Sequence, residues 1–60
     1  MPDNKELIRM HLESYLHEYW NEGWIPSWAT VLSYCNGYYG EITLDMLSVV
    51  RQLQLLGKIE

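Results

Sequence analysis

The chain has 60 residues, a length that fits one small domain whose folding covers about 60% of the surface exposed by the unfolded chain. Its single cysteine, Cys35, excludes an intrachain disulfide and fits a reducing, cytoplasmic compartment. No apolar run approaches the roughly 20 residues that span a bilayer, so we expect no membrane segment. The formal net charge of −4 opposes the basic face that duplex-binding domains normally carry.

The first predicted helix covers residues 4–22. Asp3 is a favourable N-cap, and Glu6, three residues later, completes a capping-box pattern. The glycine that follows this range is a typical C-terminal stop. At about 100° per residue, Leu7 and Met10 lie off the main apolar face and are expected to face solvent or a partner. That face consists of Ile8, Leu12, Tyr15, Leu16 and Tyr19.

The second predicted helix covers residues 28–35 and begins after an N-cap at Ser27. Its predicted end is the Asn36-Gly37 pair, which is a strong turn signal. Residues 38–42, which include two tyrosines and a glycine, are then expected to form a connection. The inward face is predicted to contain Val31, Leu32 and Cys35, with Trp28 one turn earlier.

The third predicted helix covers residues 44–56, with Thr43 as its N-cap and Gly57 as its end, before an extended tail. A helix that is apolar on most sides is normally buried on most sides. Three short helices cannot supply that cover, so a homodimer through this helix is expected. The apolar residues are Leu44, Met46, Leu47, Val49, Val50, Leu53, Leu55 and Leu56, and the narrow polar stripe is Asp45, Ser48, Arg51 and Gln52.

These elements predict one all-α domain over residues 1–60, a three-helix bundle of the helix-turn-helix type. Their order resembles the winged helix-turn-helix DNA-binding domain of LexA-type repressors. The family's β-hairpin wing would begin where this sequence ends, so the resemblance implies a winged-helix-like fold without a full wing. The residues that carry the resemblance are Gly23, Pro26, Ser27, Val31, Leu32, Val50, Leu53, Gly57 and Ile59.

The first functional hypothesis is a small non-enzymatic regulatory protein that dimerises and binds another protein. A transcription regulator is the expected partner, in the style of small phage or mobile-element proteins. The acidic surface would suit a basic partner, because complementary fields steer association. The candidate partner or dimer interface residues are Trp24, Trp28, Tyr38, Tyr39, Leu44, Met46 and Val49.

The alternative hypothesis is a transcriptional regulator that binds specific DNA sequences directly through the third helix. Glu41 and Asp45 would then lie where phosphates approach, and the net charge disfavours nucleic acid further. In this hypothesis Thr43, Ser48, Arg51 and Gln52 would face the bases, while Lys5, Arg9 and Lys58 would hold phosphates.

Two groups of side chains keep two interpretations each. The aromatic residues Trp20, Trp24, Trp28, Tyr38 and Tyr39 either pack the junction of the first two helices or form a partner surface. The acidic residues Glu13, Glu18 and Glu22, which have no basic cluster nearby in the sequence, form either a contact face or a solvated face.

We expect no catalytic residue, no metal and no cofactor. His11 and His17 are six residues apart, so on a helix they point about 120° away from each other and cannot share a metal ion. Cys35 on an inward face suits a small buried hydrophobic residue. The sequence contains no Ser-His-Asp set, glycine-rich phosphate loop or carboxylate pair that would indicate catalysis.

Overall fold

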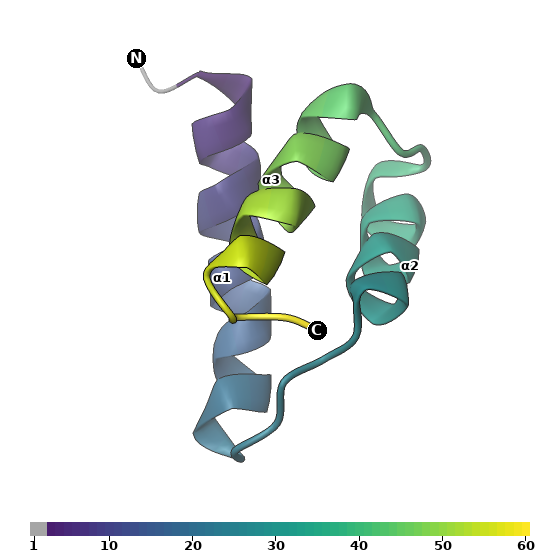
Figure 1. Cartoon of the computed structure of the whole chain (residues 1–60). Coiled ribbons are helices and arrows are strands. Elements are labelled where there is room, and N and C mark those ends of the chain that lie inside the picture. The colour runs from purple at the N-terminus through teal and green to yellow at the C-terminus, as the bar shows by residue number, and fades with distance from the viewer. Residues whose placement is uncertain (1–2) are drawn as a thin grey trace.

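Residues 3–60 are described by the computed structural model of the chain, and they fold into three helices (Figure 1). The helices are α1 (Asn4–Asn21), α2 (Trp28–Tyr39) and α3 (Leu44–Leu55), and no strand occurs in this part of the chain. The protein is therefore an all-α three-helix bundle, as the periodicity predicts. Helix α3 packs against both other helices, whereas no Cα atom of α1 lies within 8 Å of a Cα atom of α2.

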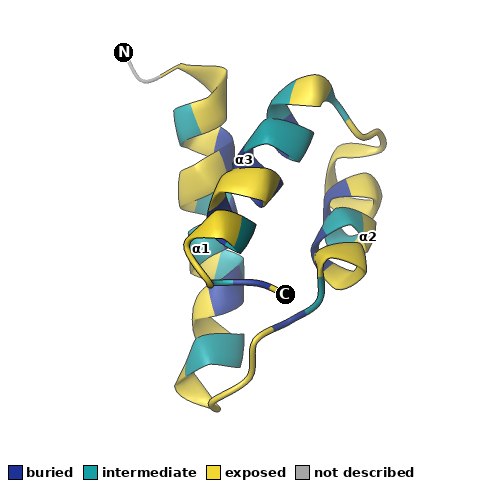
Figure 2. Ribbon diagram, in the orientation of Figure 1, coloured by how far each residue is buried: buried dark blue, intermediate teal, exposed yellow. Residues whose placement is uncertain are grey.

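The core is a single apolar cluster on the inner sides of the helices (Figure 2). No charged or polar side chain among the described residues is buried in it. The inner face of α1 is confirmed, and Leu7 and Met10 are exposed as expected. The buried residues are Ile8, Leu12 and Leu16 from α1, Val31 and Cys35 from α2, Met46, Val49, Val50 and Leu53 from α3, and Ile59 from the tail.

Each helix begins at the N-cap that the sequence predicts. The Asp3 carboxylate accepts a hydrogen bond from the backbone N–H of Glu6, and Ser27 and Thr43 act in the same way on α2 and α3. The Glu6 side chain pairs with Arg9 instead of completing a capping box. These hydrogen bonds satisfy backbone donors that a helix leaves free at its start, so they fix where the helices begin.

The predicted end of the second helix at Asn36-Gly37 is wrong, because α2 continues to Tyr39. Gly40 ends it in the left-handed conformation, with φ of 80°, and its N–H donates to the Asn36 carbonyl oxygen. The extra turn carries the tyrosines that contact His11 on α1. Tertiary packing therefore outweighs the local turn signal at this position.

The tail after α3 packs back onto the loop between α1 and α2. Ile59 is only 2% exposed, and the Glu60 N–H donates to the Pro26 carbonyl oxygen at 2.9 Å. The Trp20 indole N–H donates to the Lys58 carbonyl oxygen, also at 2.9 Å. These contacts give the tail a partner that the sequence did not indicate.

Gly37 offers a test of the longer α2. It lies inside the helix, and a Cβ atom added there would meet no atom within 4 Å. We expect Gly37→Ala to raise the free energy of unfolding by about 0.5–1 kcal/mol, because glycine weakens a helix interior by that amount. Chemical denaturation monitored by circular dichroism measures the change.

The matched control is Gly40→Ala. It should lower the free energy of unfolding by about 1–2 kcal/mol, because a side chain at positive φ is strained. A destabilised Gly37→Ala protein would contradict the helical assignment of residues 36–39.

Candidate functional site

The structure separates the seven predicted interface residues into core and surface. Met46 and Val49 are each 4% exposed and belong to the core, so they are not available to a partner in this fold. This corrects their assignment to a surface, because they lie on the side of α3 that packs against the other helices. The remaining five, which are exposed, are Trp24, Trp28, Tyr38, Tyr39 and Leu44.

The loop between α1 and α2, together with the first residue of α2, carries an apolar surface, which we call the tryptophan loop (residues 24–28). Trp24 is 65% exposed, and Ile25 and Trp28 are also exposed. The backbone beneath them is nevertheless held in place: the Trp24 N–H donates to the Tyr19 carbonyl oxygen at 2.9 Å, and Pro26 is buried. Three large apolar side chains are thus displayed on an ordered loop.

Negative charge lies beside this loop. Glu18 and Glu22 are exposed at the end of α1. They lie before and after Tyr19, whose carbonyl oxygen accepts the hydrogen bond from Trp24. The last turn of α1 contains no basic residue. Because the C-terminus of a helix also carries a partial negative charge, the helix dipole adds to these carboxylates.

The outer face of α3 is a second exposed surface, opposite the residues that enter the core. Leu44 is 84% and Leu55 is 66% exposed, one near each end of the helix. Ser48 and Arg51 lie between them on the same face at about 100° per residue. The Arg51 guanidinium donates to the Gln54 side-chain oxygen at 2.8 Å. This face therefore has a leucine at each end and polar residues at its centre.

All five tyrosines and His11 form one aromatic cluster that joins α1 to α2. The Tyr15 and Tyr34 rings stack with centroids 3.6 Å apart. The two ring nitrogens of His11 lie 2.6 Å and 2.8 Å from the hydroxyl oxygens of Tyr39 and Tyr34. A tyrosine hydroxyl can donate or accept, so both contacts suit either tautomer of histidine. The other members are Tyr19, which packs edge-on to Tyr15, and Tyr38.

This cluster gives Tyr38 and Tyr39 a structural role that composition alone does not assign. The sequence did not indicate the roles of His11, Tyr15 and Tyr34 either. A signal was present in the spacing, since residues four apart share a helix face, as His11 and Tyr15 do. Which face of α2 meets them depends on the packing of the helices and is not encoded locally.

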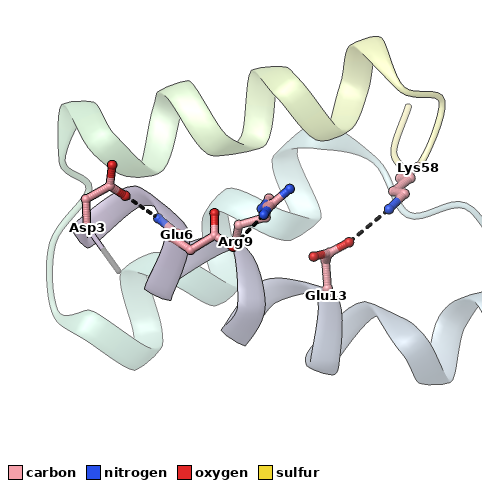
Figure 3. Close-up of polar contacts among 5 residues, drawn as sticks. All are labelled: Asp3, Glu6, Arg9, Glu13 and Lys58. Carbon is pink, nitrogen blue, oxygen red and sulfur yellow. Dashed lines mark hydrogen bonds and ion pairs between the residues drawn. The ribbon is translucent and has the colours of Figure 1, made fainter. Parts of the chain in front are cut away.

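Most of the basic side chains line a groove of about 320 Å³ between α1 and α3. Arg9 pairs there with Glu6, and the Lys58 ammonium lies 2.8 Å from the Glu13 carboxylate (Figure 3). Glu13 thus finds its basic partner in a residue far away in the sequence, where no nearby cluster of basic residues indicates one. The groove contains the cations Lys5, Arg9 and Lys58 and the anions Asp3, Glu6 and Glu13.

The charges of the groove cancel, so the rest of the molecule carries the whole net charge of −4. Arg51 is the single Lys or Arg outside the groove, and five carboxylates accompany it. A surface of this kind repels polyanions and attracts basic partners. Those five carboxylates are Glu18, Glu22, Glu41, Asp45 and Glu60.

Most of the residues proposed for DNA contact already have other contacts or line the groove. Thr43 uses its hydroxyl to cap α3, Ser48 and Gln52 line the groove, and Arg51 is bonded to Gln54. Two of the three candidate phosphate-binding side chains, Arg9 and Lys58, are occupied in ion pairs. A phosphate would have to displace carboxylates from both.

The described part of the chain contains no group of three His, Cys, Asp or Glu residues placed to hold a metal ion. Burial raises the pKa of the Cys35 thiol, which favours the protonated and less nucleophilic form. Among residues 3–60, no helix has the length and apolar character needed to cross a membrane.

No family model, curated protein or solved structure matches the chain. The resemblance to LexA-type winged domains therefore stays a prediction.

The aromatic cluster predicts a loss of stability at alkaline pH. Burial, together with the hydrogen bond to the Tyr19 hydroxyl, raises the pKa of Tyr15 from 10.0 to about 12, and burial also raises the pKa of Tyr34 and Tyr39. The folded protein thus holds these protons more tightly than the unfolded chain. The stabilisation is complete below pH 10.0 and is lost as the pH rises towards 12.

Chemical denaturation across this range, with tyrosinate absorbance as a second readout, measures the effect. Tyr15→Phe should flatten the alkaline decline, because it removes the group whose pKa is raised to about 12. An unchanged decline in that variant would contradict the assignment to Tyr15.

Proposed function

We propose that the protein is a small non-enzymatic regulatory protein that forms a homodimer and binds a second, basic protein. The observation that carries the binding part is the tryptophan loop, where Trp24, Ile25 and Trp28 are exposed on a fixed backbone. Large exposed apolar clusters usually mark contact surfaces. Tryptophan is also among the residues most enriched at the energetic centres of protein interfaces.

The order of the loop favours binding. Hydrogen bonds hold the loop on both sides of Ile25. The Trp24 N–H donates to α1, and the Pro26 carbonyl oxygen accepts from the N–H of the last residue of the tail. Ser27 then caps α2. A surface that is already ordered loses little conformational entropy when a partner binds. When a partner covers the two indole rings, most of the free energy gained from their burial can therefore contribute to affinity.

The charge beside the loop supports a basic partner. Glu18 and Glu22 are exposed at the end of α1, just before the loop that carries Trp24, and the last turn of that helix contains no basic residue. The chain already contains one cation–π contact, in which the Lys58 ammonium lies 5.5 Å from the centre of the Trp20 ring. A lysine or arginine of the partner would contact Trp24 in the same way.

A DNA-binding regulator is the partner class that fits this chemistry, since such proteins display basic faces. Binding beside that basic face would let a small acidic protein compete with DNA. Direct DNA binding by this chain has less support, because its cations are largely paired in the groove and its remaining surface is negative.

The test uses a fluorescently labelled, synthetic helical peptide in which turns containing leucine alternate with turns containing arginine. The peptide is titrated with the protein at low salt. We expect Trp24→Ala to weaken binding at least about tenfold, as loss of an interface anchor does. Glu18→Gln combined with Glu22→Gln should weaken binding and reduce its salt dependence. Fluorescence anisotropy gives the affinities.

The matched control is Leu7→Ala, which removes another exposed apolar side chain, on α1, and should leave binding unchanged. A peptide with glutamate in place of arginine should not bind. Peptide binding that is insensitive to Trp24→Ala would contradict the proposal. Salt-sensitive binding of duplex DNA that is lost in Arg51→Ala would favour the alternative.

A further inference from the structure

The groove between α1 and α3 has the size and the apolar wall of a small-molecule site. Its volume of about 320 Å³ lies at the lower end of the range of about 300–1,000 Å³ that ligand pockets occupy. Val49 and Leu53 line the groove and also belong to the core, so packing fixes their positions. Leu56 lines it too and is exposed to solvent. An aliphatic group of a ligand would therefore meet an apolar surface that already exists.

The polar side of the groove is a row of alternating charges. On α1, Arg9 lies three positions after Glu6 and four before Glu13, so the three side chains are neighbours on the helix surface. Arg9 pairs with Glu6, and Lys58 from the tail completes the row, with its ammonium 2.8 Å from the Glu13 carboxylate (Figure 3). These four side chains are 33–45% exposed, so a ligand can reach them.

The row discriminates between ligands by their charge. A monoanion that binds Lys58 displaces the Glu13 carboxylate, which then lies unpaired beside another anion. A monocation that binds Glu13 leaves Lys58 unpaired in the same way. A zwitterion exchanges both partners at once, because its carboxylate binds Lys58 while its ammonium binds Glu13. Since a polar group that loses its partner costs more than one whose partner is replaced, the row favours a zwitterion.

We propose that the groove binds a free α-amino acid with an aliphatic side chain, such as leucine. The α-carboxylate of the ligand binds the Lys58 ammonium, and its α-ammonium binds the Glu13 carboxylate. The side chain of the ligand packs on Leu53 and Leu56 on the opposite wall. This inference goes beyond the proposed function, because none of these residues belongs to the tryptophan loop, and either proposal can fail alone.

The exposure of the charged side chains sets the strength of binding. Ion pairs that are open to solvent contribute little free energy, because water competes for both partners. We therefore expect a dissociation constant on the order of 1 mM. Added salt should weaken binding further, since it screens both contacts of the ligand.

The ligand class is tested by titrating the isotopically labelled protein with leucine at low salt while NMR follows the backbone amide signals. The signals of Glu13, Ser48 and Lys58 should shift to saturation, whereas that of Thr30 on α2 should not. N-acetyl-leucine keeps only the negative charge, leucinamide keeps only the positive charge, and glycine lacks the side chain. Each should bind at least about tenfold more weakly than leucine. A compound of these three that binds as tightly as leucine would overturn the inference.

Two matched pairs of variants locate the site. Glu13→Gln should weaken leucine binding at least about tenfold, whereas Glu41→Gln, the same change at an exposed position outside the groove, should not. Leu56→Ala should weaken it about threefold or more, whereas Leu55→Ala should not. Leu55 and Leu56 are 66% and 64% exposed, and only Leu56 lines the groove.

Circular dichroism should be the same for all four variants. Equal affinity for leucine within either pair would overturn the inference. If Glu13→Gln disturbs the fold, the comparison of Leu56→Ala with Leu55→Ala decides alone, because both substitutions remove a similarly exposed side chain.

Discussion

The inner stripe of α3 joins the two halves of the molecule. Val50 and Leu53 are fully buried between α1 and α2, and without them the first two helices would have no shared core, since their backbones do not approach each other. The aromatic cluster bridges the remaining space, because only long side chains such as those of Tyr15 and Tyr34 can span it. With a single cysteine the chain cannot form an internal disulfide. Its small core is stabilised by one amphipathic helix placed centrally and by the aromatic rings that fill the space beside it.

The position of α3 also determines which surfaces remain for a partner. A helix committed to the core on one side must present its other side outward, and here that side ends in two exposed leucines. The tryptophan loop lies where α1 and α2 are joined, and its side chains are exposed as well. The molecule therefore exposes apolar side chains both on the tryptophan loop and at the two ends of α3.

The sequence predicted the fold well where the signals are local. Asp3, Ser27 and Thr43 gave the helix starts, because capping depends on residues within one turn. The end of α2 was missed, since Asn36-Gly37 is a turn signal that distant contacts with His11 outweigh. The site was predicted in part. The exposed tryptophans and Leu44 were identified, but α3 is apolar nearly all round, so its pattern could not tell buried Met46 from exposed Leu44. Pairs such as Glu13 with Lys58 join positions far apart in the sequence.

The contact between the tail and the loop has a consequence for how recognition could be tuned. Ile59 is buried, and the N–H of the next residue, Glu60, donates to the Pro26 carbonyl oxygen in the middle of the loop that displays Trp24. The order of that loop is thus a long-range property of the chain, shared between its middle and its last turn. A substitution at Ile59 would therefore change how firmly the loop backbone holds Trp24 and Trp28, although Ile59 itself is buried and exposes almost no surface.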